Sequence, residues 1–122
     1  MKKTFILFLF FTITTVLFLS CKKNENPKAV VYVIDEEDRP VVGAKVELFS
    51  RPNGTILEDR EFTGEDGKTF HEFVFTSTLD VLVEKEPVGH YNKRFGEGEI
   101  DLEYDKTTNV TIVISEQVLE EN

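Results

Sequence analysis

The sequence contains very few residues that carry redox or metal chemistry. Its 122 residues include one cysteine, two histidines, one methionine and no tryptophan. A single cysteine excludes a disulfide within the chain. No second histidine, cysteine or carboxylate stands at zinc-ligand spacing, so the sequence does not support a zinc site and we expect no cofactor. The length suits one domain and not two.

Basic residues are also scarce. Lysine and arginine number 14 against 23 aspartates and glutamates, which gives a formal net charge of −9. Without residues 1–20 the balance is 12 basic against 23 acidic, or −11, because Lys2 and Lys3 are lost. Nucleic acids and anionic lipid headgroups attract basic surfaces, so this balance argues against both as partners. We expect a solvated acidic surface on a monomeric domain.

The N-terminus has the layout of a secretory signal. Met1-Lys2-Lys3 is followed by the seventeen residues Thr4 to Ser20, none of which is charged. A basic start, an apolar middle and a small residue at the end are typical of a helical signal peptide. An uncleaved membrane helix remains the alternative, because seventeen residues lie at the short limit of the spanning range and Lys22-Lys23 follow.

The only cysteine stands directly after this apolar run. The segment Leu17-Phe18-Leu19-Ser20-Cys21 resembles the lipobox of bacterial lipoproteins, with Phe18 where that family prefers leucine. The resemblance implies that the Cys21 sulfur carries a diacylglycerol, that the signal is cut before Cys21, and that the new amino group is acylated. Several acyl chains on one residue would hold a domain firmly on a membrane. The resemblance also implies the cell envelope, and the lack of aspartate at position 22 favours the outer membrane of a Gram-negative-type bacterium.

The rest of the chain reads as short β-strands separated by turns. No stretch of ten residues has a helical pattern. Apolar or alternating runs occur at residues 29–34, 44–49, 55–62, 69–75, 79–84, 99–104 and 110–114. Seven short strands without a helix to cover a sheet predict an all-β, antiparallel two-sheet Greek-key sandwich of the prealbumin-like or Ig-like kind.

Two segments of this region resemble a known family. The runs RPVVGAKVEL (39–48) and TGEDGKTF (63–70) are similar to the motifs of the carboxypeptidase regulatory-like family, with Gly64 where Asp or Asn is usual. The resemblance implies a transthyretin-like (prealbumin-like) sandwich. Such motif residues specify a scaffold and carry no chemistry. The chain lacks the C-terminal Tyr-Arg-Gly-Ser motif of the transthyretin-like hydrolases of 5-hydroxyisourate, so that activity is not expected.

These readings divide the chain into four parts. They are a signal peptide (1–20), a polar tether (21–28), the carboxypeptidase regulatory-like sandwich (29–115) and an acidic tail (116–122).

The candidate binding residues lie in the longest predicted loop, Pro87 to Gly98. His90, Tyr91, Lys93 and Arg94 gather there, and exposed loops on a rigid scaffold are common binding sites. A solvated loop without a ligand is the alternative.

Two further groups of side chains have a possible chemical role. Asp35, Asp38 and Asp66 are turn carboxylates that would bind Ca²⁺ only if they converged, and no EF-hand spacing is present. His71 lies among phenylalanines in a strand pattern and is expected to be a packed histidine rather than a catalytic base.

The sequence therefore predicts a lipid-anchored envelope protein whose sandwich is a non-catalytic binding or structural module. Its partner would be an envelope protein or a glycan. The alternative is a hydrolase, or an accessory domain of one, that uses the loop of His90.

Overall fold

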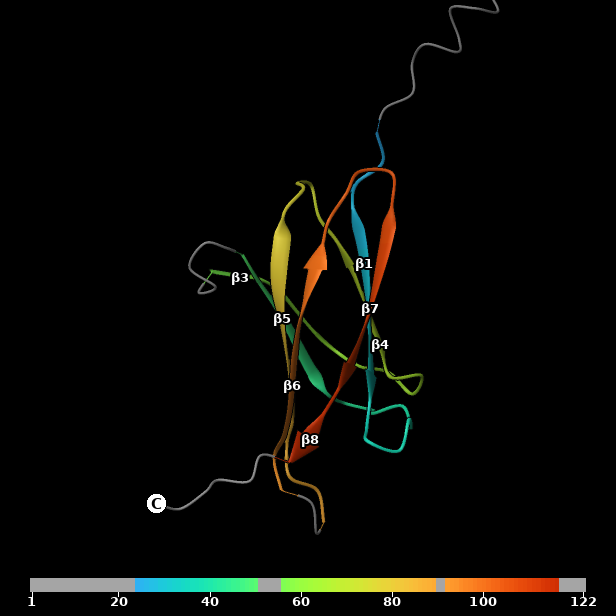
Figure 1. The fold of residues 1–122 in the computed structure, drawn as a ribbon, viewed down its shortest axis with the longest axis vertical. Coiled ribbons are helices and arrows are strands. Elements are labelled where there is room, and N and C mark those ends of the chain that lie inside the picture. The colour runs from blue at the N-terminus through green and yellow to red at the C-terminus, as the bar shows by residue number, and fades with distance from the viewer. Residues whose placement is uncertain (1–23, 51–55, 90–91, 117–122) are drawn as a thin grey trace, which may run out of the picture.

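The computed structural model describes residues 24–50, 56–89 and 92–116, and these form an all-β domain (Figure 1). The predicted signal peptide and Cys21 lie outside the described residues. The strands are β1 (Lys28–Ile34), β2 (Lys45–Ser50), β3 (Ile56–Phe62), β4 (Lys68–Glu72), β5 (Thr78–Lys85), β6 (Arg94–Asp101), β7 (Thr107–Val113) and β8 (Ser115–Glu116).

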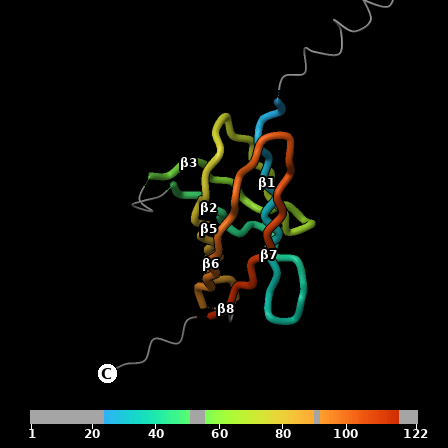
Figure 2. Tube along the Cα trace, turned by 45° about the horizontal axis from the view of Figure 1, so that its top comes forward, coloured from blue at the N-terminus to red at the C-terminus, as the bar shows by residue number. Residues whose placement is uncertain are grey.

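The strands make two sheets that face each other, which confirms the predicted sandwich. One sheet has the order β4-β1-β7 and the other has the order β3-β2-β5-β6-β8. Five strand pairs are antiparallel, but β1 and β7 pair in parallel, with Val31 opposite Val110. The prediction of a purely antiparallel sandwich is wrong at this pair. The chain crosses from β6 to the other sheet before β7, so β7 runs beside β1 in the same direction (Figure 2).

Alternation along the strands builds one core between the sheets. In β5, for example, Leu79, Val81 and Val83 are buried and the residues between them are partly exposed. A strand turns successive side chains to opposite faces, so a strand such as β5 supplies every second residue to the core, whereas β3 supplies none. The other buried apolar residues of the strands are Ala29, Val31, Val33, Ile34, Val46, Leu48, Ile100 and Ile112.

Two predicted boundaries differ from the structure. The run predicted as a strand to Phe75 ends as β4 at Glu72. The Phe73 amide still donates to the Pro27 carbonyl at 3.0 Å, but Pro27 has no N–H to return the bond, and the chain bends at the next two residues. The loop predicted to run to Gly98 ends where β6 begins at Arg94. The strand predicted over residues 99–104 therefore lies earlier in the chain than expected.

Glycines in β6 let the two sheets approach closely at one edge. A Cβ on Gly96 would lie 2.6 Å from Cγ2 of Ile112 and 2.7 Å from the carbonyl oxygen of Val113. A Cβ on Gly98 would lie 2.6 Å from Cδ1 of Ile112. Because neither glycine has a side chain, Ile112 packs directly on the β6 backbone, and β7 closes this edge of the sandwich.

The motif residues of the resemblance have structural roles. The hydroxyl of Thr63 accepts a hydrogen bond from the Ala44 amide at 2.9 Å and donates one to the Val41 carbonyl. Gly67 has a φ of 74°, and a Cβ there would lie 2.7 Å from the Val33 carbonyl oxygen. These contacts join the turn before β4 to the chain around β1 and β2.

The folded part begins before Ala29, where the sequence analysis placed its start. Pro27 is buried, and Glu25 exchanges two hydrogen bonds with Asp105: the Glu25 amide donates to the Asp105 carboxylate at 2.6 Å, and the Asp105 amide donates to the Glu25 carbonyl at 3.0 Å. The described ranges contain no helix long and apolar enough to span a membrane.

Gly96→Ala tests the close approach of β7 to β6. Its methyl group would overlap Ile112 and the Val113 carbonyl, so we expect a loss of about 1–3 kcal/mol in the free energy of unfolding, measured by urea denaturation. Gly64→Ala is the matched control, because a Cβ there would lie 3.5 Å from Asp66 Oδ1, an ordinary contact. It should change stability by less than about 0.5 kcal/mol. Equal stability of the two variants would contradict the packing described.

Candidate functional site

The sandwich has two different ends. The chain enters β1 at one end, beside the β4–β5 and β6–β7 turns, which is the upper end in Figure 1. We call this the entry end. The β1–β2 turn, the β5–β6 loop and β8 lie together at the opposite end, which we call the distal end (Figure 1). Segments that are far apart in the sequence therefore meet at the distal end.

An open pocket of about 210 Å³ lies at the distal end. It combines two guanidinium groups with four carboxylates, and the β1–β2 turn supplies four of its side chains. The lining residues are Asp35, Glu36, Glu37, Arg39, Arg94, Ile114, Ser115 and Glu116. The structure thus brings the predicted binding residue Arg94 and the predicted calcium ligand Asp35 to the same pocket.

The turn of Asp35 is organised by its own side chain. Oδ1 of Asp35 accepts hydrogen bonds from the amides of Glu37 (2.9 Å) and Arg39 (3.0 Å), and Oδ2 accepts one from Nε of Arg39 (2.9 Å). The amide of Arg39 is the main cause that lowers the pKa of Asp35, with help from the Glu37 amide and the Arg39 guanidinium and against some desolvation. Asp35 is therefore an ionised carboxylate with both oxygens engaged.

The three calcium candidates do not form a site in the described part of the chain. Asp38 is exposed with a φ of 61°, and Oδ1 of Asp66 accepts from the Lys68 amide at 3.1 Å in a separate turn. Among residues 24–50, 56–89 and 92–116, no group of three or more Asp, Glu, His or Cys side chains is placed to hold a metal ion.

The predicted binding loop is divided by the fold. His90 and Tyr91 lie outside the described residues. Lys93 lies 3.5 Å from Glu84 and 3.8 Å from Glu86, with its ammonium 5.2 Å from the centre of the Phe95 ring. Arg94 is the first residue of β6, and its backbone lies opposite that of Glu116 in the β6–β8 strand pair. Of the two predicted residues that the structure describes, Lys93 and Arg94, only Arg94 lines the distal pocket.

The outer face of the five-stranded sheet carries a row of ion pairs. Arg60 holds the Glu47 carboxylate through two nitrogens at 2.7 and 3.1 Å, and Lys45 lies 3.3 Å from Glu47 and 3.0 Å from Glu84. Burial raises the pKa of Glu47, but the hydrogen bonds from Arg60 and Lys45 outweigh it and lower the pKa overall. The hydrogen bond to Glu84 is the main cause that raises the pKa of Lys45. These pairs link side chains of β3, β2 and β5, which the backbone ladders hold side by side.

A second hollow lies further along the same outer face. It has a volume of about 550 Å³, and its lining combines apolar residues such as Phe49 and Leu82 with the acidic residues Asp80, Glu97 and Glu99.

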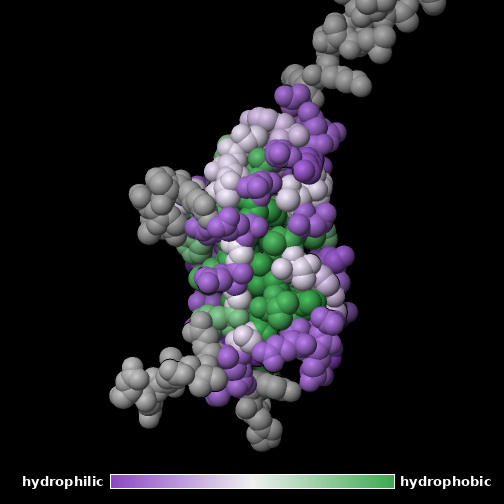
Figure 3. Space-filling view, in the orientation of Figure 1, coloured by the Kyte–Doolittle hydropathy of each residue, from purple (hydrophilic) through white to green (hydrophobic). Residues whose placement is uncertain are grey.

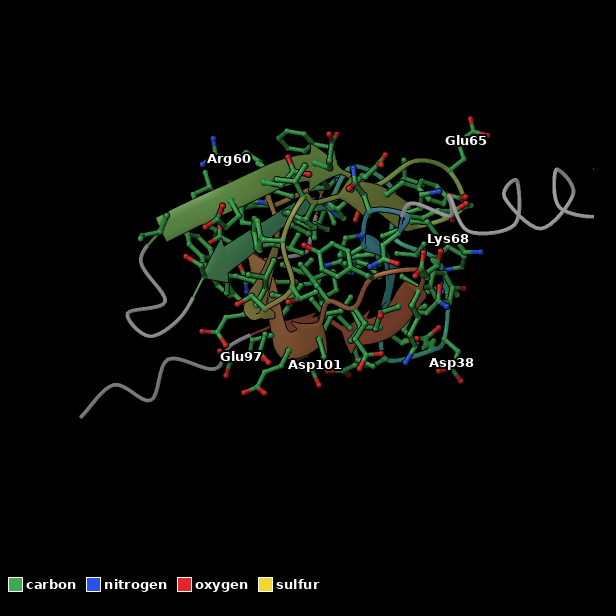
Figure 4. The ribbon with its side chains drawn as sticks, turned by 90° about the horizontal axis from the view of Figure 1, so that it is seen from above. Asp38, Arg60, Glu65, Lys68, Glu97 and Asp101 are labelled. Carbon is green, nitrogen blue, oxygen red and sulfur yellow. The ribbon has the colours of Figure 1, made fainter. Side chains whose placement is uncertain are left out.

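The surface carries both charged and apolar side chains. In Figure 4 the labelled charged side chains point away from the space between the sheets; they are Asp38, Arg60, Glu65, Lys68, Glu97 and Asp101. Figure 3 shows apolar side chains in the middle of the face between β6 and β7, and hydrophilic ones around both ends. The guanidinium and carboxylate groups of the distal pocket suit it to a polar ligand.

A buried polar cluster, which the sequence analysis did not foresee, closes the edge between β3 and β4. Nδ1 of His71 lies 2.6 Å from Oδ2 of Asp59, and Nε2 lies 2.7 Å from the hydroxyl of Thr69. Phe73 stacks on the ring with 6.4 Å between centroids and an interplanar angle of 14°. The prediction that His71 is a packed histidine agrees with this setting, since its side chain is 0% exposed.

The cluster has the order of a hydroxyl, a histidine and a carboxylate, as in hydrolytic triads. A nucleophile must reach its substrate, however, and Thr69 is only 2% exposed. Neither the distal pocket nor the hollow on the outer face includes any of the three residues. The arrangement satisfies buried polar groups and joins one sheet to the other. The spacing Thr-x-His in an inward-facing strand pattern was its only signal in the sequence.

Comparison with known proteins adds no family. No protein-family profile matches the chain, and no curated protein matches it. The functional argument therefore depends on the geometry of this domain.

Thr69→Val tests the buried cluster. Valine keeps the shape and the strand preference of threonine but leaves Nε2 of His71 without its partner, so we expect a loss of about 1–3 kcal/mol in unfolding free energy. Thr111→Val, on an exposed position of β7, is the control and should stay within about 0.5 kcal/mol of wild type. If both variants unfold at the same urea concentration, the cluster does not hold this edge.

Asp35→Asn tests the charge of the β1–β2 turn. Because the folded pKa of Asp35 is lowered, its stabilisation is present above the unfolded value of about 3.9 and is lost as pH falls through the folded pKa. The variant should lose stability at neutral pH and show a shallower decline in acid, measured as unfolding free energy against pH. Asp38→Asn makes the same charge change in the same turn without removing the contacts of Asp35. It should follow the wild-type curve, and an identical effect of both variants would contradict this role for Asp35.

Proposed function

We propose that this protein is a lipid-anchored cell-envelope protein whose β-sandwich is a non-catalytic binding or structural module. The observation that carries the proposal is that the tether enters at one end of the sandwich and a polar pocket lies at the other end (Figure 1). A module held on a membrane by the entry end would present its distal end to partners. The lipobox resemblance of Leu17 to Cys21 supports the anchor.

The partner is an envelope protein or a glycan. The distal pocket offers carboxylates that accept hydrogen bonds and guanidinium groups that donate them. Its acidic groups outnumber its basic ones, so an anionic ligand is a poor fit. Hydroxyl-rich sugars or a polar segment of a protein can use both donors and acceptors. Recognition by turns and loops on a rigid sandwich is a common mode for this architecture.

The scaffold also supports a module rather than an enzyme. A carboxypeptidase regulatory-like, prealbumin-like sandwich is the family proposal, supported by the two motifs and by the structural roles of Thr63 and Gly67. We propose the outer membrane of a Gram-negative-type bacterium as the location, on the residues around Cys21.

The anchor is tested by Cys21→Ala in growing cells. The wild-type protein should incorporate labelled fatty acid and lose its signal peptide, whereas the variant should do neither, because the sulfur is the attachment point. Labelling of the variant would refute lipidation at Cys21. A variant that is unlabelled but still membrane-bound at normal yield, together with an unlabelled wild type, would instead support an uncleaved N-terminal membrane helix.

The recognition end is tested by site-specific photocrosslinking in intact cells. A photoreactive amino acid at Glu36 should capture a partner, and one at Glu103, at the entry end, should not capture the same partner. Arg94→Ala should lower the yield from position 36, and Lys106→Ala should leave it unchanged. Protease or glycosidase treatment then assigns the captured mass to a protein or a glycan. Equal capture from positions 36 and 103 would contradict recognition at the distal end.

A hydrolase, or an accessory domain of one, that uses the loop of His90 remains the second proposal from the sequence. Turnover of ester, amide or glycoside substrates that His90→Ala abolishes would support it and replace the first.

A further inference from the structure

The entry end of the sandwich is held firmly to the chain that precedes it. The two hydrogen bonds between Glu25 and Asp105 join that chain to the β6–β7 turn, and the Phe73 amide bonds to the Pro27 carbonyl from the β4–β5 turn. The two turns are joined to each other, since the Leu102 amide donates to the Ser77 carbonyl at 2.8 Å. The entry end is therefore a single body made of both turns and the incoming chain.

The tether is too short to separate this end from a membrane. Four peptide units lie between Cys21 and Glu25, and a fully extended chain spans at most about 3.3–3.6 Å per residue. A lipid on Cys21 would therefore hold Glu25 within about 14 Å of its attachment point. Glu25 is bonded to the β6–β7 turn, so that turn must stay near the headgroups.

The same end presents two exposed apolar side chains. Val74, in the β4–β5 turn, is 75% exposed, the most of any large hydrophobic residue in the described ranges. Tyr104, in the β6–β7 turn, is 45% exposed, and its hydroxyl donates to the Val74 carbonyl at 3.4 Å. Tyrosine is enriched at membrane–water interfaces, where its ring lies among the apolar groups and its hydroxyl among the polar ones.

Three carboxylates of this end have partners, and one of these partners is a cation. Glu103 lies 2.9 Å from Lys106, and Glu72 accepts a hydrogen bond from the Asn26 amide group at 3.3 Å. The Asp105 carboxylate accepts from the Glu25 amide. The acidic balance of the chain nevertheless disfavours anionic lipid, so a zwitterionic headgroup is the better match.

We propose that Val74 and Tyr104 form a membrane-contact tip that rests on zwitterionic phospholipid and makes the sandwich stand upright, with its distal end away from the bilayer. The inference rests on the proposed lipid anchor at Cys21. It adds a second, non-covalent contact with the bilayer, and it fixes which end of the domain a partner can reach.

Tryptophan fluorescence tests the contact directly, because the chain has no tryptophan of its own. Tyr104→Trp places a reporter in the tip, and Val88→Trp places a matched reporter in the β5–β6 loop of the distal end, where Val88 is 56% exposed. The fatty-acylated mature protein, extracted from cells, is reconstituted in phosphatidylcholine vesicles with or without brominated acyl chains. Val74→Trp is a second tip reporter in case Tyr104→Trp folds poorly.

The tip reporter should show a blue-shifted emission and lose intensity in brominated vesicles, and the Val88→Trp reporter should do neither. Adding Val74→Ser to the Tyr104→Trp variant should reduce the quenching. Protein that floats with the vesicles while its tip reporters stay unquenched would overturn the tip and leave the anchor intact. Equal quenching at both ends would overturn the upright orientation. Protein that does not float with the vesicles would overturn the anchor, and the tip with it.

Discussion

The close packing of β7 on β6 is the contact on which the rest of this fold depends. The chain must leave the five-stranded sheet after β6 and enter the other sheet within a turn of five residues, 102–106. That crossing works because Gly96 and Gly98 leave room for Ile112 against the β6 backbone. β7 can then lie parallel to β1 and cover the core. The close packing of β7 on β6 thus lets β7 form one edge of the three-stranded sheet.

Different kinds of interaction close the two edges of the sandwich. At the β6–β7 edge the contact is apolar and depends on the absence of side chains. At the β3–β4 edge it is polar, through Asp59, His71 and Thr69. A buried histidine with both ring nitrogens bonded specifies one alignment of β3 against β4, since a shift of one residue would leave its partners unpaired. The two ends of the sandwich are not closed in this way. The chain enters at the entry end, and the polar pocket lies at the distal end.

Much of the fold followed from alternation, and the parts that did not have identifiable reasons. The strands around Val46, Leu48, Leu79 and Val81 were predictable because apolar and charged residues alternate there in the sequence. The first residues of β6 were predicted as a loop, because glycine has a low strand preference. The glycines are needed here because they leave room for a residue of the other sheet, a contact that the local sequence does not reveal. The parallel pairing of β1 and β7 could not be predicted, since both directions of pairing fit the same pattern of side chains.

The candidate site was predictable only in part for the same reason. Arg94 and Asp35 were each identified from the sequence, but their meeting in one pocket depends on the topology. Asp35 was a calcium candidate only on the condition that turn carboxylates converge, and its hydrogen bonds with the amides of Glu37 and Arg39 could not be foreseen because they arise only when the turn closes. The cluster around His71 needs β3 beside β4, and β3 has exposed residues on both faces, so its sequence gave little indication of where Asp59 would lie.

The central proposal is that the domain has a membrane end and a partner end, set by where the chain enters β1. Neutron reflectometry of the acylated protein on a supported phosphatidylcholine bilayer measures this most directly. The account predicts a protein layer that begins at the headgroups without an intervening water layer and extends at least about 25 Å outward, the length of an eight-residue strand such as β5. A hydrated gap between headgroups and protein, or a layer thinner than the strands are long, would contradict it.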